Sequence, residues 1–297
     1  AAMPLNVTSG GGADILDGGA GNDTIDGGAG ADIIDGNGGL DNLSGGAGND
    51  TIRVNAKTEF ITAYGADIVD GGAGTDTLEL GASMNLVATQ LATISNIEKI
   101  TIPDGSDLTI SDDVLANNPG IKFNFAGAGT LSTGEDTAGA SLMTTGINVA
   151  ATAAGNLKLV GSQSADTFTF TKTESLTADD TIDGNAGSDT IILSTQDDTD
   201  TTGESVEGVF GSNVTNVETI LISDQGADQS AGNAEVTINS GFTSLAITVD
   251  GTELDANPLG GAGESLTVTN NDNTKLTVLG GGYNDTVTSS TGADNIS

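Results

Sequence analysis

The chain repeats a nine-residue pattern five times in succession near its N-terminal end. Residues 9–53 read SGGGADILD, GGAGNDTID, GGAGADIID, GNGGLDNLS and GGAGNDTIR. Every copy has glycine at the fourth place, aspartate at the sixth and an aliphatic residue at the eighth. A short unit of this kind buries its apolar side chain only by stacking on its neighbours, so the repeat predicts a solenoid.

Each repeat divides into a turn and a strand. A glycine-rich hexapeptide can take φ values that other residues avoid, so it turns the chain and aims successive carbonyl oxygens at one point. The next three residues are extended, with the aliphatic side chain pointing inward and its neighbours outward. Two repeats therefore form one flattened coil, and repeats n and n+2 stack about 4.8 Å apart as parallel strands.

This stacking places the sixth-place aspartates on two edges. Asp14, Asp32 and Asp50 fall on one edge, and Asp23 and Asp41 on the other. Carboxylates this close repel one another unless a cation lies between them. Oxygen-only donors on flexible loops favour Ca²⁺ over Mg²⁺ or a transition metal. The repeat thus predicts a row of calcium ions along each edge.

The rhythm continues less regularly up to residue 79. In VNAKTEFIT (54–62), Glu59 takes the aspartate place and Ile61 the aliphatic place. AYGADIVD (63–70) is one residue short but keeps Asp67, and GGAGTDTLE (71–79) restores the full pattern with Asp76. We therefore expect Asp67 and Asp76 to extend the two edges.

A longer repeat is superimposed on the nonapeptides. The sequence from Asp50 recurs from Asp166, and Lys57-Thr58-Glu59 has a counterpart in residues 172–174. SNIEKITI (95–102) returns as TNVETILI (215–222), and residues 156–169 return as 274–288. A module of about 115–120 residues is thus present about twice, and a third copy begins near the end. The later copies contribute further candidate ligands, namely Asp166, Asp180, Asp189, Asp285 and Asp294.

The segments between the repeats, 80–160 and 193–279, have the pattern of short strands. Alternating runs such as KFNF (122–125) and SLTVT (265–269) are separated by Gly, Asn and Asp turns. Stacking these runs onto the coils at both ends gives one long parallel solenoid, and a separate small sandwich in each gap is the alternative. Among few helical signals, MNLVATQLATI (84–94) indicates one short turn of helix.

Composition excludes several classes of function. With no His and no Cys, the chain has no Ser-His-Asp triad, no thiol nucleophile and no zinc site of the usual ligands. With 42 acidic and 7 basic residues, its net charge of −35 would repel nucleic acid and anionic lipid surfaces. No apolar run reaches the roughly 18 residues of a membrane helix, and AAMPLNVTSG lacks the regions of a signal peptide. We expect no catalytic residues, no nucleic-acid partner and no direct membrane insertion.

The nonapeptides resemble the repeats-in-toxin (RTX) family, whose motif is G-G-x-G-x-D followed by x, an aliphatic residue and x. The resemblance implies a parallel β-roll that holds Ca²⁺ between adjacent turns, through the aspartates and the carbonyls of the second and fourth loop residues. These carbonyls would belong to Gly19, Gly21, Gly28, Gly30, Gly46, Gly48, Gly72 and Gly74, while Asn37 replaces glycine at one second place.

The predicted fold class is therefore all-β: a right-handed parallel β-helix or β-roll solenoid in which RTX calcium-binding coils alternate with irregular β-solenoid segments. After a lead-in at 1–8, RTX coils are expected at 9–79, 161–192 and 280–297, with β-rich solenoid segments at 80–160 and 193–279. Glu98 and Glu218, which recur one module apart, are interpreted as having a repeated structural role rather than as a catalytic pair.

The modular layout resembles RTX-type bacterial S-layer proteins and, nearly as closely, large RTX adhesins. This implies type I secretion, an extracellular or cell-surface location, folding on contact with external calcium, and self-association into a surface array. The competing interpretation is the calcium-binding secretion module of an RTX protease or lipase. Calcium-coupled folding is physically reasonable, because one buried aliphatic side chain per repeat does not offset the ordering entropy of its residues, at ~1–2 kcal/mol each.

Overall fold

The computed structural model describes most of the chain. The described residues are 2–60, 66–81, 83–134, 143–152, 155–171, 176–194, 206–223, 234–239, 246–251, 266–271, 275–280, 285–288 and 295–296. They form two compact units, Ala1–Glu135 and Asp136–Ser297, each of which is built almost entirely from short parallel strands. No helix in the described part of the chain is long and apolar enough to cross a membrane.

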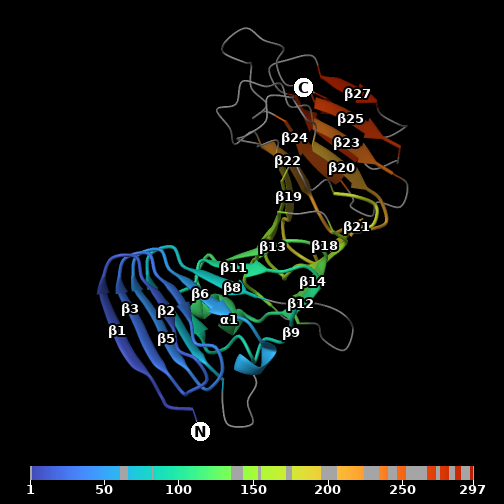
Figure 1. Cartoon of the computed structure of the whole chain (residues 1–297). Coiled ribbons are helices and arrows are strands. Elements are labelled where there is room, and N and C mark those ends of the chain that lie inside the picture. Colours follow the sequence, from blue (N-terminus) through green and yellow to red (C-terminus); the bar gives the residue numbers. More distant parts are fainter. Residues whose placement is uncertain are drawn as a thin grey trace. The chain divides into compact units, whose positions relative to one another are not determined.

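The first unit contains three parallel sheets. One has the order β1 (Asn6–Gly11), β3 (Thr24–Ala29), β5 (Asn42–Ala47), β7 (Ile68–Ala73) and β10 (Ile94–Ser95). The second has the order β2 (Ile15–Asp17), β4 (Ile33–Asp35), β6 (Thr51–Val54), β8 (Thr77–Leu80), β11 (Lys99–Ile102) and β13 (Lys122–Phe125). The third consists of β9 (Asn85–Leu86), β12 (Ser106–Thr109) and β14 (Gly129–Ser132). Figure 1 shows β1, β3 and β5 stacked side by side.

The second unit repeats this architecture. Its longest sheet has the order β15 (Asn148–Ala151), β17 (Thr167–Phe170), β19 (Thr190–Ser194), β22 (Thr219–Ser223), β24 (Ala246–Asp250), β26 (Lys275–Leu279) and β28 (Asn295–Ile296). A second sheet is β16 (Leu157–Val160), β18 (Thr181–Asp183) and β21 (Val214–Thr215). A third is β20 (Val206–Phe210), β23 (Ala234–Ile238), β25 (Leu266–Asn270) and β27 (Thr286–Thr288).

The strand register confirms the eighteen-residue coil. Asn6 pairs with Thr24, which pairs with Asn42, and Ile15 pairs with Ile33, so repeats n and n+2 are neighbours. In the intervening segments the strands continue the same parallel sheets, as β11 does on β8 and β22 on β19. Within each unit, therefore, the predicted parallel solenoid is confirmed, and the described strands of the intervening segments continue it rather than form separate sandwiches. The finer six-segment division of the chain stays a prediction.

The core is a column of inward-facing side chains. The eighth-place residues Ile25, Ile34, Leu43, Ile52 and Leu78 are at most 1% exposed. Beyond the nonapeptides the column widens to phenylalanine: Phe123 pairs with Ile100 and Phe125 with Ile102 in the neighbouring strand. Larger core side chains allow a longer coil to close without a void, because protein interiors are packed to nearly constant density.

Residues 54–60 do not form the turn of the nonapeptide that the sequence predicts at 54–62. Lys57–Glu59 forms a short 3-10 helix (η1), and the carboxylate of Glu59 accepts the N–H groups of Asn55 (3.2 Å) and Ala56 (2.8 Å). The segment is an insertion into a coil, and Asp67 takes the ladder place that we assigned to Glu59. Glu59 is not part of the ladder, because its carboxylate accepts N–H groups of its own loop rather than one from the neighbouring coil. Ile61 and residues 172–174 lie outside the described residues.

The helix prediction was also wrong in position. Residues 84–94 contain β9, reverse turns and β10, with Gln90 and Leu91 donating to carbonyls three residues back. The α-helix is instead α1 (Asp112–Asn117), in which Val114 and Leu115 are buried. A helix of six residues with two buried apolar side chains is too short for a helical hydrophobic period to be recognised in the sequence.

Candidate metal centre

The sixth-place aspartates form hydrogen-bonded ladders along the edges of the first unit. In ladder 1 the N–H of each aspartate donates to Oδ1 of the aspartate one coil later: Asp14 to Asp32, Asp32 to Asp50 and Asp50 to Asp76, at 2.7–2.8 Å. In ladder 2, Leu5 donates to Asp23, Asp23 to Asp41 and Asp41 to Asp67, at 2.7–2.9 Å. The predicted two edges are therefore present, and a main-chain N–H links each carboxylate to the next.

The second unit has a shorter ladder of the same type. In ladder 3, Ile147 donates to Asp166 (2.7 Å) and Asp166 donates to Asp189 (2.8 Å). Two further aspartates accept one N–H each from a neighbouring coil, Asp180 from Leu157 and Asp285 from Leu266. Asp294, the last predicted ligand, lies outside the described residues.

The second oxygen of several ladder aspartates is buried without a hydrogen-bond partner. This holds for Oδ2 of Asp23, Asp32, Asp41, Asp50, Asp76 and Asp189. Each of these residues is at most 2% exposed. A buried polar atom without a partner costs about 1–3 kcal/mol, and more when it is charged. A row of such atoms therefore indicates that a cation completes them.

A loop glycine leaves room for this oxygen. A Cβ added to Gly27, at the first place of its repeat, would lie 2.6 Å from Asp32 Oδ2 and 2.6 Å from the carbonyl oxygen of Gly45. The carboxylate oxygen and a carbonyl oxygen of the next coil thus approach a common point. The same arrangement recurs at the first-place glycines Gly18, Gly45, Gly71 and Gly184. The first-place carbonyl is a candidate ligand that sequence reasoning missed.

Loops with a hydroxyl residue satisfy their own aspartate. Ser9 Oγ donates to Asp14 Oδ2 (2.6 Å), and the Ser162 N–H donates to Asp166 Oδ2 (2.7 Å). Thr177 donates to Asp180 Oδ2 through both its N–H and its hydroxyl. The aspartates with a free Oδ2 follow loops that begin Gly-Gly or Gly-Asn. The first two loop residues are thus a sequence signal that separates the two groups.

Most glycines at the second and fourth places have positive φ and stack closely on the carbonyls of the coil before them. The second-place residues Gly19, Gly28, Gly46 and Gly72 have φ between 85° and 99°, and Asn37 replaces them at φ 61°. At the fourth place, Gly30, Gly48 and Gly74 have φ between 139° and 151°. A Cβ on Gly46 or Gly48 would meet the carbonyl of Gly28 or Gly30, and one on Gly39 would meet that of Gly21. The Gly19 carbonyl accepts the N–H of Gly38 (2.9 Å).

Burial raises the pKa of six ladder aspartates. Desolvation raises the pKa of Asp67 and Asp76 to about 6 and that of Asp189 to about 7. The main-chain N–H groups that these carboxylates accept lower the pKa, but by less than desolvation raises it. The pKa values of Asp41, Asp50 and Asp166 are also raised by burial. Without a bound cation the folded ladders therefore hold their negative charge unfavourably.

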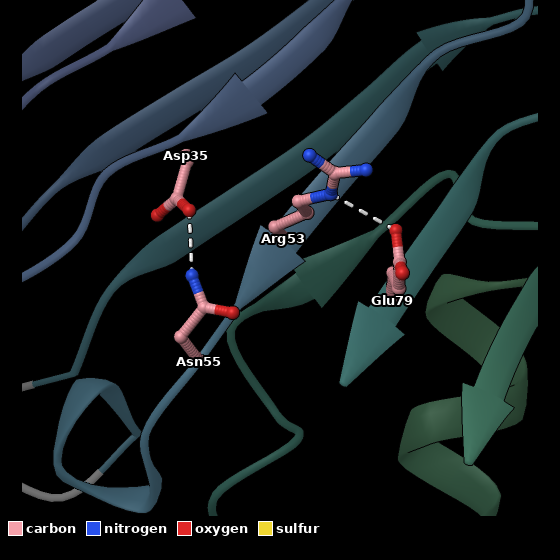
Figure 2. A network of polar contacts seen from close by, with 4 residues as sticks. All are labelled: Asp35, Arg53, Asn55 and Glu79. Carbon is pink, nitrogen blue, oxygen red and sulfur yellow. Dashed lines mark hydrogen bonds and ion pairs between the residues drawn. The ribbon is translucent and has the colours of Figure 1, made fainter. Parts of the chain in front are cut away.

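The ninth-place residues form a separate acidic row on the outer face. In Figure 2 the Asn55 amide donates to Asp35 (2.5 Å), and Arg53 pairs with Glu79 (3.0 Å). Asp17, Asp35, Arg53 and Glu79 are in register on neighbouring strands. These charges are paired or exposed, and the side chains of Arg53 and Glu79 are both about 40% exposed. The outer row therefore lacks the orphaned atoms of the ladders.

The ladder residues fit calcium by the nature of their donors. Ca²⁺ takes six to eight oxygen ligands, and carboxylate and carbonyl oxygens are the donors present here. Among the described residues, no three carboxylates lie close enough to form a metal site by themselves. An ion in a ladder would therefore take at most two carboxylates and the rest of its ligands from loop carbonyls and water.

Two glutamates close the ladders. The Asp76 N–H donates to Glu98 Oε2 (2.7 Å), and the Asp189 N–H donates to Glu218 Oε2 (2.8 Å). The structural role that we expected for these residues is thus the last carboxylate of ladder 1 and of ladder 3. Their recurrence one module apart was the sequence signal, but it did not reveal what they contact.

Comparison with known proteins identifies the repeats. A family model described as RTX calcium-binding nonapeptide repeat (4 copies) matches residues 8–43, 35–56, 60–82, 176–200 and 277–297. No curated protein and no solved structure gives a significant match. The matched segments include the loops of ladders 1 and 2 and that of Asp189. The solenoid therefore carries RTX-type repeats, a motif that binds calcium.

Proposed function

We propose that this chain is the calcium-binding structural repeat region of a secreted bacterial cell-surface protein, of the S-layer type, which folds when it binds calcium. The observation that carries the proposal is the row of buried aspartate oxygens without partners. The ligands we assign are those oxygens together with the loop carbonyls that converge on them.

Folding and calcium binding are coupled by charge. Asp50 and Asp76 are buried beside each other in ladder 1. Ionising them without a cation opposes folding, whereas a divalent ion turns the same oxygens into ligands and contributes its binding energy to the folded state. Extracellular calcium modules bind their ions with dissociation constants of about 10⁻⁴–10⁻³ M, so such a chain folds only where calcium is abundant. This supports folding after export.

The repetitive architecture supports a structural rather than a catalytic role. Both units consist of stacked parallel strands, and each ends a ladder with the same type of glutamate contact. A chain of net charge −35 repels its own copies until divalent ions neutralise it. Calcium would therefore permit self-association into a surface array as well as folding.

The proposal is tested by removing calcium from the whole chain. We expect circular dichroism of the full chain in chelator to lack the β-sheet spectrum and the spectrum to appear when calcium is added to mM concentration. Sedimentation of the same samples reports whether calcium also drives association. A spectrum that does not respond to chelator or calcium contradicts calcium-coupled folding.

One substitution makes the test specific to the ladder. Asp50→Asn keeps an oxygen that can accept the Asp32 N–H (2.8 Å) but removes the charge of the orphaned atom. We expect it to raise the calcium concentration needed for folding severalfold. Asp107→Asn, on the exposed side of β12, removes the same charge away from the ladders and should leave that concentration unchanged. Equal shifts in the two variants would show that net charge alone is responsible.

A further inference from the structure

Each unit contains a three-residue turn in place of a six-residue loop. Asn96-Ile97-Glu98 follows β10, and Asn216-Val217-Glu218 follows β21. We refer to both as Asn-x-Glu turns. In each, the asparagine has φ 53°, a left-handed conformation that asparagine tolerates better than most residues. This conformation reverses the chain early and shortens the loop.

The two turns make the same contacts with the coil before them. Ser95 pairs with Asp70, so Asn96 stacks on the first-place glycine Gly71, and its amide donates to Asp70 at 2.7 Å. In the second unit, Asn216 stacks on Gly184 and its amide donates to Asp183, also at 2.7 Å. The asparagine thus takes the place of the first-place glycine of the next coil.

The glutamate takes the place of the sixth-place aspartate. Oε2 of Glu98 accepts the Asp76 N–H, as Asp76 Oδ1 accepts the Asp50 N–H one coil earlier. The N–H groups of Glu98 and Lys99 both donate to the Asp76 carbonyl at 3.1 Å. The additional methylene of glutamate lets its carboxylate reach the ladder from a turn that is three residues shorter.

The orphaned oxygen of the last aspartate faces this turn. Asp76 and Asp189 are fully buried, and Oδ2 of each has no hydrogen-bond partner. A Cβ on Gly184 would lie 2.6 Å from Asp189 Oδ2 and would also meet the Asn216 carbonyl oxygen. A Cβ on Gly71 would lie 2.9 Å from Asp76 Oδ2 and would meet the Asn96 carbonyl. Aspartate and asparagine oxygens therefore converge as they do at the full loops.

We propose that each Asn-x-Glu turn completes a terminal calcium site, formed by the last ladder aspartate, the asparagine carbonyl and the glutamate carboxylate. The site in the first unit uses Asp76, Asn96 and Glu98, and the site in the second uses Asp189, Asn216 and Glu218. The inference rests on the proposed calcium binding of the ladders and extends it to residues outside the RTX motif. A glutamate that only accepted an N–H would not need its charge, whereas a ligand does.

Counting the bound ions tests the role of the glutamates. We expect Glu98→Gln to lower the calcium bound per chain by one ion in equilibrium dialysis, Glu218→Gln to do the same, and the double variant to lose two. Glutamine retains an oxygen for the Asp76 N–H, so the turn can keep its hydrogen bond. Glu79→Gln, on the outer face beside Arg53, is the matched control and should bind as many ions as the unchanged chain. Unchanged ion counts in Glu98→Gln and Glu218→Gln would overturn the inference.

A measurement on the unchanged chain does not depend on how the variants fold. Crystals grown with calcium should show anomalous density next to Asp76 Oδ2 and the Asn96 carbonyl, and at the equivalent point in the second unit. Density at the full loops but not at the turns would refute this inference alone. Absence of calcium density at every loop would refute the proposed function itself.

Discussion

At the scale of single residues, the aspartate of each loop supplies the oxygens and the first-place glycine leaves space for one of them. Asp32 uses one oxygen to accept the Asp14 N–H and keeps the other free beside the carbonyl of Gly45. The free oxygen exists only because Gly27 has no side chain to fill the space. Where serine enters the loop, as at Ser162, the aspartate is satisfied internally and its second oxygen is no longer orphaned. The potential to bind an ion is therefore decided by residues that do not carry charge.

Adding one methyl group at Gly27 should close the site. Gly27→Ala places a Cβ 2.6 Å from both oxygens, which forces the carboxylate or the next coil to move. We expect it to destabilise the calcium-loaded chain by about 1–3 kcal/mol in urea unfolding, as overpacking does. Gly38→Ala is the control, because nothing lies within 4 Å of its Cβ, and its effect should be at most about +1 kcal/mol of stabilisation. Equal stabilities for the two variants would contradict a crowded first place.

At the scale of elements, helix α1 secures the Asn-x-Glu turn of the first unit. Asn118, which follows the helix, is completely buried and accepts the Ile97 N–H at 2.9 Å. Its amide donates to the carbonyls of Ile94 (3.1 Å) and Val114 (2.8 Å). The Asn117 carbonyl also accepts the Asn96 N–H. One side chain thus joins the helix end, strand β10 and the turn.

Removing that side chain should loosen the turn. Asn118→Ala removes hydrogen bonds to three buried main-chain groups, and we expect the free energy of unfolding in saturating calcium to fall by roughly 3 kcal/mol. Asn117→Ala, whose side chain is exposed, should change it by less than about 0.5 kcal/mol. Denaturant unfolding of both variants measures the difference. Similar losses would mean that the turn is held by its main-chain contacts alone.

At the scale of the whole molecule, buried acids make stability depend on pH. The pKa values of Asp76 (about 6), Asp189 (about 7) and Glu59 (about 7) are raised above their ordinary values, chiefly by burial. The folded state therefore holds more protons than the unfolded chain between pH ~4 and ~7. This contribution to stability is fully present below the unfolded pKa values and is lost as the pH rises through 6 and 7.

Mild acid should therefore partly replace calcium. In calcium-depleted buffer we expect more β structure by circular dichroism at about pH 5 than at about pH 7.5, since protonation removes the buried charge. With saturating calcium the difference should shrink, because the ions keep the ladder carboxylates ionised in the folded state. A calcium-free chain that gains structure as the pH rises would contradict the burial of these acids.

The regular part of the fold was predictable because one residue type controls each feature. The eighth-place aliphatic residues predicted the core, and the sixth-place aspartates predicted both ladders up to Asp50. The nonapeptide pattern breaks at Glu59, whose carboxylate accepts N–H groups of its own loop instead of one from the neighbouring coil. Prediction also missed the contact of Asn96 with Asp70 and those of Asn118 with Ile94 and Ile97, since these partners are 21–26 residues away along the chain. Contacts across coils of unequal length have no fixed spacing to detect.

Unequal coils have a consequence for how such a chain can grow. The ladders advance by one carboxylate per coil whether that coil has 18, 22, 26 or 29 residues. The η1 insertion lengthens the steps from Asp50 to Asp76 and from Asp41 to Asp67 alike, so it disturbs neither row. The length of a unit along the solenoid axis is therefore set by its number of coils and not by its number of residues. Residues can thus be added at the corners of the coils while successive ladder carboxylates keep the same contact with the next coil.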